Sequence, residues 1–151
     1  MTATAHPPAP TPALPSTDAD GLPLWRLQAM RVGYAFMGIG LALVKWPLVI
    51  NHAQSLPLFE GVEAVLLTAM SLLAFLGLRY PVRLLPVLLF ECLWKLIWLG
   101  VVALPAVAAG SVDQAMSTVI VNCSLVVIVL VVVPWRYVAQ HYVTAKGDRW
   151  R

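Results

Sequence analysis

The stretch LLPVLLFECLWKLIWLGVVALP, from Leu84 to Pro105, decides the fold of this chain. It is apolar over the ~20 residues that a helix rising ~1.5 Å per residue needs to cross ~30 Å of hydrocarbon. Glu91 and Lys95 nevertheless lie near its middle. Because a charge is costly in hydrocarbon, the stretch predicts a membrane-spanning helix whose charged face points into a bundle.

The composition of the whole chain also indicates a membrane protein. Of its 151 residues, 60% are hydrophobic and 11% are charged, whereas soluble domains carry about 25% charged residues. Four apolar stretches are long enough to span a bilayer, and the last of them ends in the strand-like run SLVVIVLVVV. An open strand in lipid would leave its backbone amides unpaired, so a helix is expected there too. We predict an all-α membrane protein with four transmembrane helices, over residues 27–50, 58–78, 83–104 and 115–134.

Basic residues are concentrated on one side of these four helices. Arg26 and Arg31 precede the first helix, Arg79 and Arg83 flank the turn between the second and third, and four more follow the fourth. The other side has only Lys45. The positive-inside rule therefore predicts that both termini are cytoplasmic. Short connections make successive helices antiparallel neighbours, which predicts an up-down-up-down bundle.

Two segments flank the predicted transmembrane domain of residues 24–138. Residues 1–23 are rich in Pro, Ala and Thr and contain no apolar run. We expect them to form a disordered tail rather than a secretory signal peptide, which would need a basic start and an apolar core. Residues 139–151 are expected to form a basic cytoplasmic tail.

The charged face of the third helix is the first candidate site. Glu91, Trp94, Lys95 and Trp98 follow a spacing of three and four residues, which places them on one face of a helix. A glutamate four residues before a lysine favours an ion pair. The pair has two interpretations: an internal contact that fixes one helix arrangement, or a polar element of a substrate, quinone or proton site lined by Trp94 and Trp98.

Other polar side chains are expected at a similar depth. Lys45 lies near the outer end of the first helix, Glu63 about a turn inside the second, and Asn122 about two turns inside the fourth. These helices meet in a bundle, which would bring opposite charges together. We predict an intramembrane polar cluster of Lys45, Glu63, Glu91, Lys95 and Asn122.

The remaining reactive residue types do not form a recognisable catalytic pattern. The three histidines lie outside the predicted helices, so no two of them can bind a haem within the bilayer. Cys92 and Cys123 are single cysteines on different helices, without a CxxC motif. P-loop, HExxH and GxSxG motifs are absent from the sequence. We predict no catalytic residue, no metal site and no resident cofactor, although a quinone is compatible with the aromatic face.

The first predicted helix contains the run RVGYAFMGIGLALVKW, and the second predicted helix and its turn contain EGVEAVLLTAMSLLAFLGLRYPVRLLPVLL. Both runs resemble the small four-helix DoxX-like membrane proteins. Arg31, Gly38 and Lys45 carry the first part of this resemblance. The second half, with FECLWKLIW and PWRYV, is similar to bacterial four-helix membrane proteins of unassigned function. DoxX-like proteins are associated with membrane redox complexes and quinone-linked sulfur oxidation, but the resemblance carries no catalytic residue onto this chain.

Three functions follow as hypotheses for a multi-pass protein of the bacterial inner membrane. The leading one is a non-catalytic accessory or anchoring subunit of a membrane complex, with a redox complex as one candidate. The second is a small oligomeric transporter or proton-linked permease that uses the Glu/Lys cluster. The third is a quinone-interacting redox subunit. Expected partners are the lipid bilayer and either other membrane subunits or further copies of this chain, and no nucleic acid.

Overall fold

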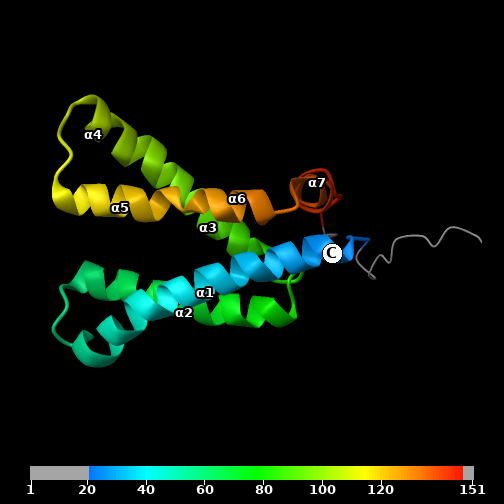
Figure 1. The fold of residues 1–151 in the computed structure, drawn as a ribbon, viewed down its shortest axis with the longest axis horizontal. Helices are drawn as coiled ribbons and strands as arrows, with labels where there is room; N and C mark the ends of the chain where they lie inside the picture. The colour runs from blue at the N-terminus through cyan, green and yellow to red at the C-terminus, as the bar shows by residue number, and fades with distance from the viewer. Residues whose placement is uncertain (1–20, 148–151) are drawn as a thin grey trace, which may run out of the picture.

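The computed structural model of the protein describes residues 21–147, and it contains helices and no β-strand in that range. Four helical spans are long and apolar enough to cross a membrane, and successive spans run antiparallel (Figure 1). This confirms the predicted fold class of an all-α, four-span bundle. Of the tails expected at residues 1–23 and 139–151, residues 1–20 and 148–151 lie outside the described residues, and the second tail begins with a π-helical turn over Ala139–Val143. The spans are α1 (Leu24–His52), α2 (Leu58–Arg79), the third span (Leu85–Ala108) and the fourth span (Gln114–Val132).

The third span extends past Pro105 by changing its helical type. It consists of α3 (Leu85–Trp98), the π-helical turn η1 (Leu99–Ala103) and α4 (Leu104–Ala108). The Leu104 amide donates to the Leu99 carbonyl five residues back. Proline has no N–H for the hydrogen bond of a regular α-helix, and a π-helical turn just before it accommodates the missing donor. The span therefore ends at Ala108 rather than at the predicted residue 104.

The fourth span is broken where one continuous helix was expected. It consists of α5 (Gln114–Ser124) and α6 (Val126–Val132), which meet at Leu125. The Ser124 hydroxyl donates to the Ile120 carbonyl (2.8 Å), a back-bond to the preceding turn that bends helices. Past Val133, whose backbone is extended as expected before a proline, α7 (Trp135–Val138) and the π-helical turn η2 (Ala139–Val143) turn across the bundle axis (Figure 1).

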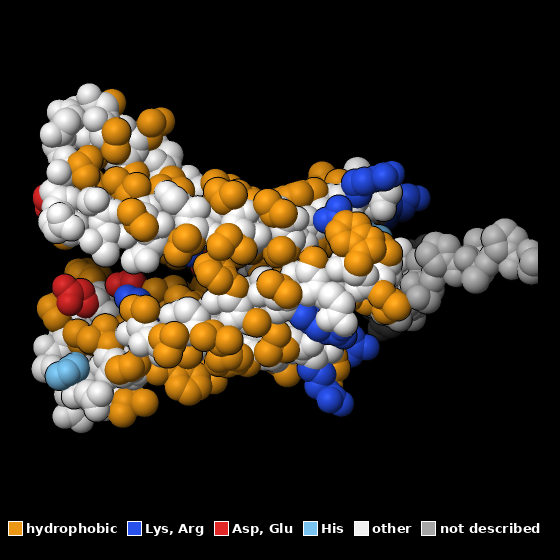
Figure 2. Space-filling model, viewed as in Figure 1, with side chains coloured by type: hydrophobic (Ala, Val, Ile, Leu, Met, Phe, Trp, Pro, Cys, Tyr) orange, Lys and Arg blue, Asp and Glu red, His pale blue; other side chains and the backbone are white. Residues whose placement is uncertain are grey.

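Positively and negatively charged side chains are concentrated at opposite ends of the molecule. On the face drawn in Figure 2, Lys and Arg gather where α1 begins and α7 lies, and Asp and Glu gather at the opposite end. We call these the basic end and the acidic end. Arg26, Arg79, Arg83 and Arg136 belong to the basic end, where α1 begins and α2 ends.

The hydrophobic core fills mainly the half of the bundle nearer the basic end. Its fully buried side chains come from all four spans, and they include Tyr34, Leu88 and Val129. Toward the acidic end the α1–α2 hairpin diverges from the hairpin of the third and fourth spans (Figure 1). The bundle is therefore tightly packed at one end and splayed at the other.

Glycines allow α1 to approach its neighbours closely. A Cβ on Gly77 of α2 would lie 2.5 Å from the Tyr34 ring, and a Cβ on Gly33 would lie 2.6 Å from the side chain of Val132 in α6. The Tyr34 hydroxyl donates to the Pro81 carbonyl (2.9 Å). Small residues that admit a neighbour in this way are the usual means of packing helices in lipid. Tyr34 thus joins the end of α2 to the start of α1.

Candidate functional site

Glu91 is the centre of the candidate site, and its side chain is 2% exposed. One carboxylate oxygen lies 2.7 Å from the Lys95 ammonium, and the other accepts a hydrogen bond of 2.8 Å from the Trp94 indole N–H. All three side chains belong to one turn of α3. The predicted ion pair is therefore present, and a tryptophan completes it.

Lys95 is the more accessible member of the Glu91–Lys95 ion pair. Its side chain is 14% exposed, and its ammonium lies 5.6 Å from the centre of the Trp94 ring. The ring face and the carboxylate both attract the positive charge of the ammonium group. The charge of Lys95 is thus balanced on two sides by its own helix.

The second ion pair joins the two helices of the first hairpin. The Lys45 ammonium of α1 lies 2.9 Å from the Glu63 carboxylate of α2. The two side chains are 18% and 58% exposed, so the pair lies at the edge of the protein rather than in its core. Within residues 21–147, no hydrogen bond or ion pair connects it with Glu91 and Lys95. Four of the five residues of the predicted cluster therefore form two ion pairs, Lys45 with Glu63 and Glu91 with Lys95.

The remaining predicted site residues stand apart from these pairs. The Asn122 side chain is exposed, and it makes no hydrogen bond within the described part of the chain. Trp98 is half-buried. Trp94 packs against the core, and its N–H is already bound to Glu91, so this donor is not free for a quinone carbonyl. Of the two tryptophans predicted as an aromatic lining, Trp94 therefore holds the Glu91 carboxylate.

Sequence reasoning missed a polar contact between α1 and α2. The Trp46 indole N–H donates to the buried Ser71 hydroxyl (2.7 Å), which donates in turn to the Thr68 carbonyl (2.8 Å). The available signal was a serine and a threonine in an otherwise apolar helix, a pattern that often marks hydrogen bonding between helices in membranes.

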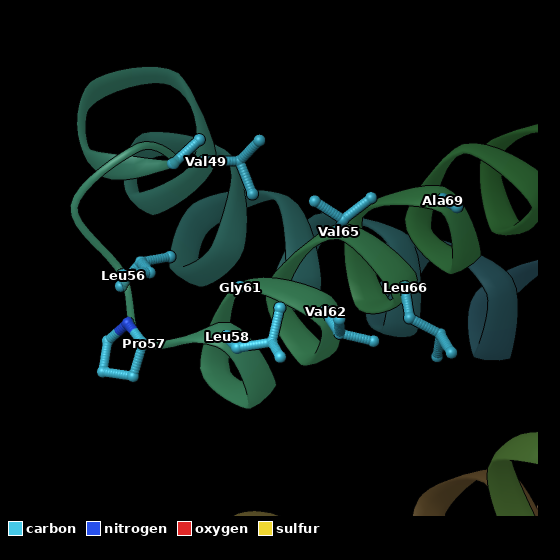
Figure 3. A pocket seen from close by; sticks show the side chains of 10 residues that line it. Val49, Leu56, Pro57, Leu58, Gly61, Val62, Val65, Leu66 and Ala69 are labelled. Carbon is cyan, nitrogen blue, oxygen red and sulfur yellow. The ribbon is translucent and has the colours of Figure 1, made fainter.

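Two concave surfaces of the described chain differ in polarity: one is apolar, and the other is bordered by charged side chains. An apolar groove of about 590 Å³ lies between the end of α1 and the start of α2 (Figure 3). It is lined by side chains such as Val49, Leu58 and Val65. Figure 2 shows a hollow between the two hairpins at the acidic end, with charged side chains at its edge. Residues 21–147 contain no group of three His, Cys, Asp or Glu side chains that could hold a metal ion.

Comparison of the chain with protein-family models, curated proteins and solved structures gives no match. The functional argument therefore rests on the geometry of the two ion pairs and on the shape of the bundle.

Proposed function

We propose that this protein is a non-catalytic accessory or anchoring subunit of a membrane complex. The observation that carries the proposal is the pairing of the buried Glu91, whose two carboxylate oxygens are each held, one by Lys95 and the other by Trp94 of the same helix. A carboxylate held on both oxygens is a poor proton carrier or substrate ligand, because either role requires breaking a buried contact. The group acts instead as a polar element that fixes how α3 packs.

The exposed apolar surface supports a partner-dependent role. Large side chains are exposed along α2 and along α5 and α6, including Leu72, Val121 and Val131. Lipid or another membrane subunit can cover such a surface, and the resemblance of the first two helices to DoxX-like proteins favours a subunit, with a redox complex as the candidate assembly. The proposal places the protein in the bacterial inner membrane with its basic end in the cytoplasm, in line with the positive-inside rule.

Purification from native membranes tests this proposal directly. The tagged full chain is extracted in a mild detergent, and the proteins that accompany it are identified and quantified by mass spectrometry. We expect another membrane protein at constant stoichiometry, retained by the double variant Glu91→Leu with Lys95→Met. Recovery of this chain alone, as a monomer or homo-oligomer, would contradict an accessory role.

A second function is favoured by the hollow at the acidic end, which is bordered by charged side chains (Figure 2). A small transporter could admit a polar solute there, next to the Lys45–Glu63 pair. The test is uptake by proteoliposomes that contain only this chain. Uptake that depends on Lys45 and Glu63 would support the transporter, and the absence of uptake across a panel of ions and small metabolites would favour the subunit.

A further inference from the structure

Two arginines at the basic end share one aromatic ring. The guanidinium carbons of Arg79 and Arg83 lie 5.6 and 5.9 Å from the centre of the Tyr80 ring, and Arg79 Nε donates to the Tyr80 hydroxyl (3.1 Å). All three side chains are exposed. The ring thus gathers two positive charges at the turn between α2 and α3.

No carboxylate in the described part of the chain neutralises these charges. The acidic residues within 21–147 are Glu60, Glu63 and Asp113 at the acidic end, and Glu91, which pairs with Lys95. Arg83 has no hydrogen bond or ion pair within that range, and Arg79 uses one donor on Tyr80. A guanidinium has five N–H donors, so most of those on the two arginines remain available.

The depth of the turn between α2 and α3 in the membrane indicates which anions can reach its arginines. The α2 helix has 22 residues, which at ~1.5 Å per residue span the ~30 Å of hydrocarbon. Tyr80 follows its last residue and therefore lies at the level of the lipid headgroups, where tyrosine and tryptophan are enriched. Trp25 lies at the same end with Arg26 over its ring, 4.3 Å from the ring centre. The anions abundant at this depth are lipid phosphates.

We propose that Arg79, Arg83 and Tyr80 form a binding site for the phosphate headgroup of an anionic phospholipid. Two guanidinium groups can bind the oxygens of one phosphate through paired hydrogen bonds, and the ring holds both side chains at headgroup level. The lipid chains then lie along the exposed apolar surface near Leu76 of α2. The site is independent of the proposed accessory role, since it needs no protein partner.

Lipid titration followed by native mass spectrometry tests the site. The full-length protein in a neutral detergent is titrated with phosphatidylglycerol and, separately, with phosphatidylcholine of the same acyl chains. We expect tighter binding of phosphatidylglycerol by the native protein. The double variant Arg79→Gln with Arg83→Gln should bind it about 30-fold more weakly, because each basic residue near an anionic surface contributes roughly a factor of five. Equal affinity of the native protein for the two lipids would overturn the proposal.

Matched variants separate a defined site from general positive charge. Arg136→Gln removes an equivalent exposed charge from α7 at the same end, and its affinity for phosphatidylglycerol should stay within about twofold, since a rim charge outside the site adds little. Tyr80→Leu keeps both arginines, and it should weaken binding about two- to fivefold through loss of the cation–π contacts. It also serves as the deciding variant if the double arginine variant does not fold. A loss for Arg136→Gln as large as for the double variant, or no loss for Tyr80→Leu, would overturn the site.

Soluble glycerol phosphate distinguishes a lipid site from a site for a free phosphate. It carries the same anionic group without acyl chains, and we expect no binding at concentrations where phosphatidylglycerol saturates the protein. Comparable binding of the soluble compound would overturn the assignment to a lipid.

Discussion

The Glu91 carboxylate combines deep burial with complete local pairing. Its partners Trp94 and Lys95 lie three and four residues along the same helix, so formation of α3 alone brings the three side chains together. Packing against the rest of the bundle then excludes other partners from the carboxylate. The cost of burying the charge is thus reduced before the helices associate.

The Glu91→Gln variant should therefore be markedly destabilised. It leaves the Lys95 ammonium next to the core without its counter-charge, and breaking a buried ion pair costs about 3–5 kcal/mol in soluble proteins. The double variant Glu91→Leu with Lys95→Met removes both charges and should recover much of that loss. Unfolding in mixed micelles of a denaturing and a mild detergent measures both free energies. Purely additive effects of the separate changes Glu91→Leu and Lys95→Met would show that the two residues do not interact.

The Lys45→Gln variant provides the contrasting case. Its partner Glu63 is 58% exposed, and ion pairs at such positions contribute about 0–1 kcal/mol. We expect the same unfolding measurement to show a loss of less than ~1 kcal/mol. A loss as large as that of Glu91→Gln would mean that the Lys45–Glu63 pair is protected from water in the membrane.

At the scale of helices, α1 and α2 pack by close approach at Gly77. The Tyr34 ring lies against the bare backbone of Gly77, and its hydroxyl is held by the Pro81 carbonyl. This contact joins the first turns of α1 to the turn that precedes α3. It therefore fixes both the spacing of the first hairpin and the place where the second begins.

A methyl group at this crossing should disturb it measurably. Gly77→Ala places a Cβ 2.5 Å from the Tyr34 ring, and overpacking of this kind costs about 1–3 kcal/mol. Gly40→Ala is the matched control, because no atom lies within 4 Å of its added Cβ, and alanine is the better helix former by about 1 kcal/mol. Thermal unfolding in detergent should show a lower midpoint for Gly77→Ala and an equal or higher one for Gly40→Ala. Equal midpoints would show that α1 and α2 can separate here at no cost.

The sequence was sufficient to predict elements whose cause is local. Four apolar stretches of bilayer length predicted the four spans, and the i, i+4 spacing predicted the Glu91–Lys95 ion pair. The π-helical turn before Pro105 and the break at Leu125 depend on the N–H that proline lacks and on the hydrogen bond of the Ser124 hydroxyl, and the apolar pattern encodes neither. The pairing of the predicted polar residues with one another depends on how the hairpins are arranged. That arrangement is a tertiary property and could not be derived from depth along single helices.

For the whole molecule, the segregation of charge bears on orientation. The described basic residues other than Lys45 and Lys95 lie at or near one end, and three of the four acidic residues lie at the other. The two ends therefore differ in sign as well as in packing. An orientation with the basic end in the cytoplasm satisfies the positive-inside rule for every connection.

Reporter fusions should detect that orientation. A reporter after Arg151 or in the turn at residues 80–84 should report the cytoplasm, and one in the loop at residues 109–113 should report the periplasm, because the arginines at the turn and at the chain ends resist translocation. Alkaline phosphatase and green fluorescent protein fusions give opposite readouts and serve as mutual controls. A periplasmic location for the C-terminal fusion would reverse the assignment of both ends.

The divergence of the two hairpins gives the molecule the outline of a wedge (Figure 1). A wedge occupies more area in one leaflet of the bilayer than in the other. Its insertion is therefore easiest where the membrane curves so that the leaflet around the acidic end is the more expanded one. The shape of the bundle thus couples the position of the protein to the local curvature of the membrane.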